Sequence, residues 1–146
     1  VGLLQAPTGT RLYERLKKEG RLLGRMTGDN ADGSTNIIPN NMDADTCREG
    51  YKTILKHIYS PENYYNRIMT LFKEYKSPTI KGTIKFEHIV GLVNSIYHLG
   101  IFGKERVQFW RLLLWTSLHR RDLFPLAVTL AVYGYHFRRV SELHVL

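Results

Sequence analysis

The six histidines and the one cysteine are the side chains of this 146-residue chain best suited to metal or nucleophilic chemistry. A single thiol, Cys47, cannot alone hold an iron–sulfur cluster or complete a zinc site. No two histidines form an HExxH pair, and the chain has no GxSxG, GxGxxG or P-loop motif. The residue types therefore predict no catalytic residue and no metal site within this chain.

The opening apolar run could instead place polar side chains at the mouth of an active site. Residues 1–6, VGLLQA, predict a strand of a buried sheet, and Thr10 can cap a following helix over 11–19 that ends at Gly20. In a βα-barrel, the carboxyl end of a strand and the next loop face the catalytic centre. Gln5 and Thr10 are therefore candidate contacts for a substrate or cofactor. In the alternative interpretation, Thr10 only caps its helix.

Two pairs of arginines are candidate anion-binding residues. They are Arg120 with Arg121 and Arg138 with Arg139. Guanidinium groups can clamp an acidic group, but cations near helix ends also interact favourably with the helix dipole. The second, structural interpretation is the stronger one.

Aromatic and basic residues also gather around an expected helix at 61–75. These residues are Tyr59, Tyr64, Tyr65, Phe72 and Tyr75, beside Lys56, Arg67 and Lys73. Such a set could stack nucleic-acid bases above a basic groove. Aromatic residues at helical spacing more often fill a core and place their hydroxyl groups at its edge. We therefore expect most of these rings to be buried.

The elements that position these residues are mainly helical. After the strand and first helix, the apolar spacing predicts about five helices. The chain is expected to divide into the end of a barrel at 1–24, a linker loop at 25–41 and a helical accessory domain at 42–146. Outside the first six residues, the chain offers only weak strand candidates, at 36–39 and 79–84. The expected fold is thus a mainly α domain preceded by a βα stub from a truncated barrel.

The charge balance suggests a second class of function. The chain carries 21 Lys and Arg against 13 Asp and Glu, a net charge of +8. This balance would suit nucleic acid or an anionic membrane surface, but the basic residues are spread along the chain rather than gathered in one tract. We expect a solvated basic surface, no membrane span and a cytoplasmic location. Because the first residue is Val1 rather than methionine, we also expect a trimmed chain.

The sequence resembles the end of cobalamin-binding radical-SAM proteins. In GLLQAPTGTRLYERLKKEGRLL, the matching residues are Pro7, Gly9, Thr10, Leu12 and Tyr13. The later stretches GDNADGSTNIIP, EGYKTILKHIYSPENYYNRI, FWRLLLW and GYHFRR are similar to the C-terminal helical region, of uncharacterised function, in a branch of these proteins.

This resemblance implies an iron–sulfur parent enzyme of methyltransferase or oxidoreductase type. Family members hold a [4Fe–4S] cluster through a Cys-x3-Cys-x2-Cys motif, use S-adenosylmethionine and bind cobalamin. None of these ligands maps onto this chain, whose only cysteine is Cys47. We therefore expect a non-catalytic piece that caps the parent's barrel and shapes substrate access, with the radical-SAM and cobalamin-binding domains as its partners. The alternative is an independent basic module that binds nucleic acid or an anionic membrane.

Overall fold

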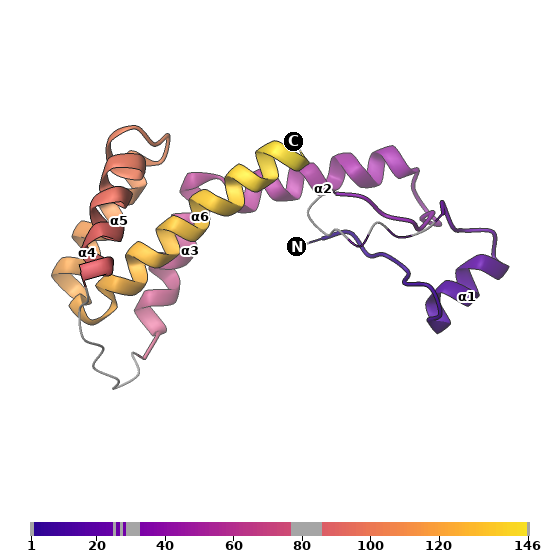
Figure 1. Ribbon diagram of the computed structural model, residues 1–146, viewed down its shortest axis with the longest axis horizontal. Coiled ribbons are helices and arrows are strands. Elements are labelled where there is room, and N and C mark those ends of the chain that lie inside the picture. The colour runs from indigo at the N-terminus through magenta and orange to yellow at the C-terminus, as the bar shows by residue number, and fades with distance from the viewer. Residues whose placement is uncertain (1, 25, 27, 29–32, 77–85, 146) are drawn as a thin grey trace. The chain divides into compact units, whose positions relative to one another are not determined.

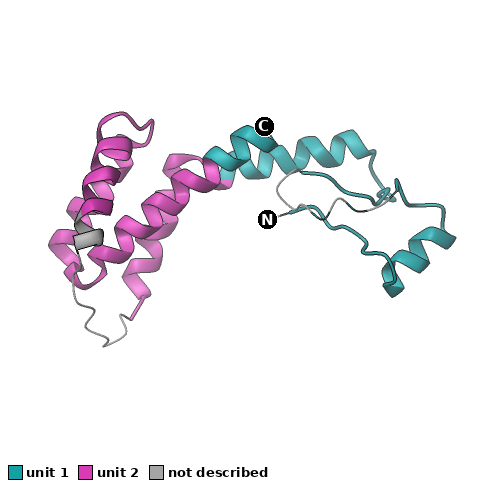
Figure 2. Cartoon of the chain, viewed as in Figure 1, with its two compact units in different colours: residues 1–57, 139–146 teal, residues 58–138 magenta. Residues whose placement is uncertain are grey.

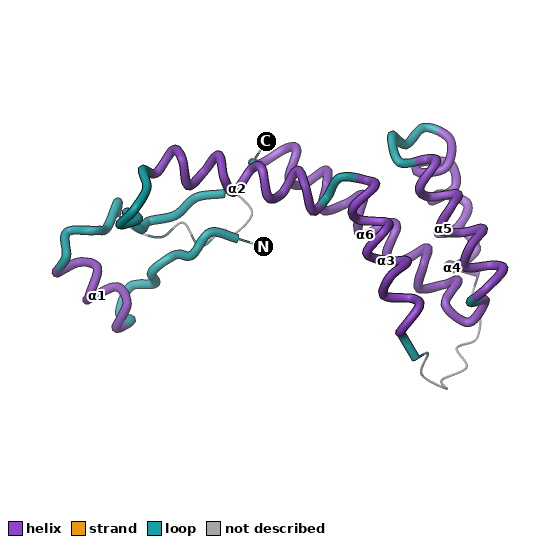
Figure 3. Tube along the Cα trace, turned by 180° about the vertical axis from the view of Figure 1, so that it is seen from behind, coloured by secondary structure: helices purple, strands orange, loops and turns teal. Residues whose placement is uncertain are grey.

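The computed structural model describes residues 2–24, 26, 28, 33–76 and 86–145, and it is mainly helical, as predicted (Figures 1 and 3). The α-helices are α1 Arg11–Lys18, α2 Ala44–Ile58, α3 Pro61–Glu74, α4 Phe86–Ser95, α5 Arg106–His119 and α6 Phe124–His144. A π-helix, η1 Ile96–Ile101, continues from α4, and a short 3-10 helix, η2 Arg121–Leu123, precedes α6. None of the described helices is long and apolar enough to cross a membrane.

Local capping residues set the ends of two helices. The Thr10 hydroxyl accepts a hydrogen bond from the Tyr13 amide at 3.2 Å at the start of α1. Ser60 accepts in the same way at the start of α3, where Pro61 occupies the first turn. Gly20 follows α1 with a φ of +68°, a conformation that glycine adopts without strain. These caps confirm the helix boundaries expected from the sequence.

The predicted strand at the start of the chain is wrong, because the described residues 2–6 form no strand. A strand needs a neighbouring strand to pair its backbone groups. Here a side chain takes that part: the Asn36 amide accepts from the Ala6 N–H at 2.8 Å and donates to the Ala6 carbonyl at 3.0 Å. Thr35 likewise donates to the Leu4 carbonyl.

Of the two weak strand candidates, only one can be assessed. Within 36–39, Ile37 forms an isolated antiparallel bridge with Leu22 and no longer strand. The candidate at 79–84 lies outside the described residues, as do parts of the expected linker. In its described part, that loop folds back onto 21–23, where the Leu23 N–H donates to the Asn36 carbonyl at 2.9 Å.

The chain forms two compact units, one of residues 1–57 with 139–146 and one of residues 58–138 (Figure 2). The expected division at residues 24 and 41 stays a prediction. In the second unit, buried side chains of α3, α5 and α6 form one hydrophobic core with Leu99 of η1. Its completely buried members are Phe72, Phe109, Leu112, Ala127 and Ala131.

A close contact between two helices orders this core. The Tyr64 ring of α3 lies against Gly134 of α6, where a Cβ atom would come within 2.7 Å of the Tyr64 Cζ atom. The Tyr64 hydroxyl donates to the Leu130 carbonyl at 2.8 Å. Glycine at 134 therefore permits α3 and α6 to approach each other.

Candidate functional site

The two candidate substrate-side residues have separate partners in the first unit. Gln5 is 9% exposed and its Nε2 atom donates to the Ser34 carbonyl and hydroxyl oxygens, each at 3.3 Å. The Thr10 hydroxyl caps α1 and donates to the Pro7 carbonyl at 2.7 Å. The capping role of Thr10 is thereby confirmed, and contact of either residue with a substrate stays a prediction.

Arg120 links the ends of α3 and α5. Its guanidinium donates to the carbonyls of Phe72 at 2.6 Å and Tyr75 at 2.8 Å, at the carboxyl end of α3. The same group bonds both carboxylate oxygens of Asp122, at 3.1 and 2.9 Å. This hydrogen bonding lowers the pKa of Asp122. Carbonyls at a helix end need such donors, so Arg120 acts here as a C-terminal cap.

The other three candidate anion-binding arginines also bond to groups of the chain. Arg121 donates to the Ser117 carbonyl at 3.0 Å, and Arg139 lies 3.4 Å from a carboxylate oxygen of Glu142. Arg138 binds Glu105. No printed contact joins any two of the four arginines to one common group, so binding of an external anion stays a prediction.

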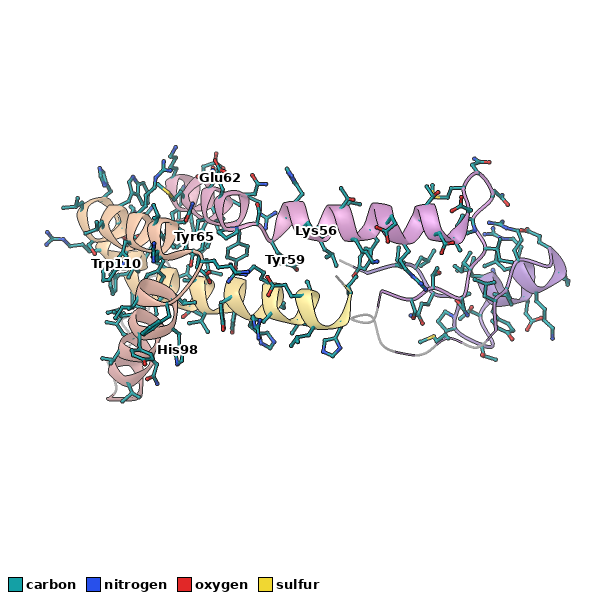
Figure 4. All side chains as sticks on the ribbon, turned by 90° about the horizontal axis from the view of Figure 1, so that it is seen from above. Lys56, Tyr59, Glu62, Tyr65, His98 and Trp110 are labelled. Atoms are coloured by element: carbon teal, nitrogen blue, oxygen red, sulfur yellow. The ribbon has the colours of Figure 1, made fainter. Side chains whose placement is uncertain are left out.

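The second unit holds a buried polar cluster of Tyr65, Glu105 and Arg138 (Figure 4 labels Tyr65). The Glu105 side chain is 1% exposed and accepts from the Arg138 Nη2 atom at 2.6 Å. The other Glu105 oxygen and the Tyr65 hydroxyl are buried with no hydrogen-bond partner in the described part of the chain. Burial, and then the charge of Glu105, raises the pKa of the Tyr65 phenol. Neutral Tyr65 is thus the favoured form.

Sequence reasoning found Arg138 but missed Glu105. The available signal was its isolation, since Glu105 is the only acidic residue between His88 and Arg121. An acidic group within an apolar and basic stretch tends to be paired when it is buried. The partner lies 33 residues away on another helix, a distance that periodicity does not reveal.

The aromatic cluster is largely a core, as expected. Tyr65 and Phe72 are 4% and 0% exposed. The Arg67 guanidinium lies 5.6 Å from the centre of the Tyr64 ring and donates to the Ile58 carbonyl at 2.7 Å. Because these rings pack inside the unit, they do not present a row of open faces for bases to stack on.

No group of three histidine, cysteine or acidic residues that could hold a metal ion occurs in the described ranges. Cys47 is a half-buried free thiol on α2. A cluster that needs three cysteine ligands does not fit this donor set.

The helical fold belongs to a recognised class of domain. The family described as a domain of unknown function, DUF4070, matches residues 10–145. Because this match covers most of the chain, the chain belongs to that family.

One curated relative carries a functional name. The "uncharacterized methyltransferase sll1242" of Synechocystis sp. is 29% identical to this chain over 145 residues. The match covers 97% of this chain but 27% of the relative, so the chain spans about a quarter of that protein. No solved structure matches the chain. The chain is therefore a domain of unknown function, similar to one part of a protein named as a methyltransferase.

Proposed function

We propose that this chain is a non-catalytic helical accessory domain of a longer methyltransferase-like enzyme, in which it shapes access to the substrate. The observation that carries the proposal is the unequal coverage: nearly all of this chain matches about a quarter of the named relative. The side chains best suited to chemistry support it, since they serve structural roles. Thr10 and Arg120 cap helices, and Arg138 pairs with the buried Glu105.

The proposed parent is a cobalamin-dependent radical-SAM enzyme with a [4Fe–4S] cluster. The Pro-x-Gly-Thr-x-Leu-Tyr stretch at 7–13 and the later matching stretches support this class by resemblance. Since Cys47 is the only cysteine, the cluster and the cobalamin would be held by other parts of the parent. Gln5 would be the substrate-side contact that this chain contributes.

A deletion in the parent tests the accessory role. Removal of residues 42–146 from the purified parent should lower substrate turnover or stability, because the helical domain is lost, while the bound iron stays at the level of the intact parent. Undiminished turnover and folding would contradict the proposal.

A matched pair of glycine variants separates this effect from gross truncation. In the parent, Gly134→Val should disturb α3 and α6 and lower turnover, because a Cβ at 134 overlaps Tyr64. Gly91→Ala should leave turnover unchanged, since a Cβ at 91 has no neighbour within 4 Å. Equal turnover of the two variants would argue against a role for the packed helices.

The cofactor class has its own test. The iron, sulfide and cobalamin contents of the purified parent should each approach one cofactor per chain, and the coding sequence upstream should contain a Cys-x3-Cys-x2-Cys motif. A parent that lacks this motif and binds no iron would refute the radical-SAM assignment, and the accessory role would still be open to the deletion test.

The net charge of +8 favours a second candidate function, an independent basic module. Binding to an anionic duplex or vesicle that weakens steeply with added salt would support it. No binding at low salt would remove it.

A further inference from the structure

The α5 helix carries large apolar side chains on its solvent-exposed side. Val107, Trp110, Leu114 and Leu118 are 68%, 40%, 60% and 73% exposed. Their spacing of three and four residues places them on one face of the helix, which we call the α5 outer face. Figure 4 labels Trp110, whose indole N–H donates to the Gly100 carbonyl at 3.1 Å.

The opposite side of α5 is already the buried one. Phe109, Leu112, Leu113 and Thr116 face the core and are at most 4% exposed. A surface helix normally has one apolar stripe and a polar face, and a helix that is apolar all round is normally buried. The α5 outer face therefore lacks the covering that its composition calls for. The adjoining η1 also exposes Tyr97 and Ile101, at 53% and 52%.

The charges around the α5 outer face have one sign. Lys104, Arg106, Arg111 and Arg121 are exposed on or next to α5. The acidic residues nearby are already paired, because Glu105 is buried against Arg138 and Asp122 bonds Arg120. A complementary surface would have an apolar centre and an acidic rim.

We propose that the α5 outer face docks onto the remaining domains of the parent chain, at an apolar patch with an acidic rim. This inference rests on the proposed function, because it needs the chain to be part of a longer protein. The length argument favours this occupant: the match leaves the larger part of the relative outside it. An apolar patch covered within one molecule needs no second partner.

Site-specific photo-cross-linking in the full-length parent tests the docking. A benzophenone side chain, Leu118→p-benzoylphenylalanine, should form adducts within one parent molecule, to peptides outside residues 1–146. The matched control is the same replacement at Leu71 of α3, which is 48% exposed in the same unit but lies on another helix. The control should give little of this product.

Each other outcome would overturn the proposal. Adducts only between two parent molecules would make the face a self-association surface. Adducts only with phosphatidylglycerol vesicles, formed by lipid rather than by protein, would make it a membrane-binding surface. Equal yields from positions 118 and 71 would show that the face is not covered. None of these results depends on the parent's cofactor, so they leave the radical-SAM assignment untouched.

A charge reversal tests the acidic rim. With the probe at position 118, Arg111→Glu should lower the intramolecular yield several-fold, because it would place like charges together. Lys73→Glu on α3 reverses an equally exposed basic residue away from the face and should leave the yield unchanged. A yield that Arg111→Glu does not alter would overturn the assignment of an acidic rim.

Discussion

Arg138 donates to the Glu105 carboxylate at 2.6 Å, and the two side chains are only 12% and 1% exposed. The pair joins α6 to the residue that precedes α5 inside the second unit. A buried ion pair of this kind adds modest net stability, because desolvation of both charges offsets their attraction. Loss of one partner is costly, since the other charge is then buried without compensation.

The first prediction follows from this asymmetry. Arg138→Met should lower the free energy of unfolding by about 3–5 kcal/mol, because Glu105 keeps its buried charge. Urea unfolding monitored by circular dichroism measures the change. The double variant Arg138→Met/Glu105→Leu should recover part of the loss, and a double variant as unstable as the sum of both single variants would contradict the coupling.

A second prediction concerns alkaline pH. Burial raises the pKa of Tyr65 in the folded chain, whereas an unfolded tyrosine titrates near pH 10. The contribution of Tyr65 is fully present below about pH 10 and is lost above it, by about 1.4 kcal/mol per pH unit, as the unfolded state releases the proton. Urea unfolding at several pH values measures this slope.

Tyr65→Phe is the matched variant for this titration. It should reduce the alkaline loss of stability, because it removes the ionising group. Near pH 7 it should change stability little, since the Tyr65 hydroxyl has no hydrogen-bond partner among the described residues. An unchanged alkaline slope would assign the effect to other tyrosines, of which Tyr64 also has a raised pKa through burial.

The sequence predicted those features that depend on neighbouring residues. Thr10, Ser60 and Gly20 act on helix ends within a few residues of themselves, and all three occur where expected. The buried Tyr65 and Phe72 follow from helical spacing in the same way.

Features that depend on distant residues escaped prediction. The first six residues have the composition of a strand, but their pairing partner is the Asn36 side chain, 30 residues away from Ala6. The partners of Arg120 and Arg138 lie 48 and 33 residues away. Local charge patterns could only place these arginines near helix ends. The exposed stripe on α5 was visible as a helix apolar on most sides, but its covered side is defined only by the core.

The third prediction concerns the contact between α3 and α6. Gly134→Ala should destabilise the chain, because a Cβ atom would overlap the Tyr64 ring, even though alanine favours helix by about 1 kcal/mol over glycine. Gly91→Ala in α4, which meets nothing within 4 Å, should show that gain instead. Thermal unfolding of the two variants measures both effects, and equal shifts would contradict the close contact.

A fourth prediction tests the cap that Arg120 forms on α3. Arg120→Met should lower the midpoint of thermal unfolding, because it removes the donors to the carbonyls of Phe72 and Tyr75. The matched control is Arg111→Met, which removes an exposed arginine from α5 and should leave the midpoint unchanged. An equal effect of both substitutions would show that charge, and not capping, stabilises the chain.

The same arginine also makes stability depend on acid. Hydrogen bonds from Arg120 lower the pKa of Asp122 in the folded state, so this contribution is present above about pH 4 and is lost as the carboxylate is protonated at lower pH. Asp122→Asn should therefore reduce the loss of stability on acidification, as measured by unfolding at pH 3 to 6. An acid profile identical to that of the unsubstituted chain would contradict the pairing.

The last prediction concerns the amide of Asn36, which is 4% exposed and holds the first residues of the chain in place. Asn36→Ala should raise the hydrogen-exchange rate of the Ala6 amide, because that N–H loses its acceptor. Asn36→Asp keeps the acceptor but replaces the donor to the Ala6 carbonyl, so it should protect the Ala6 amide better than alanine does. Amide exchange followed by mass spectrometry separates the two variants. If neither substitution changes exchange at Ala6, another group must hold residues 4–6, and the Asn36 side chain is not the substitute for a neighbouring strand.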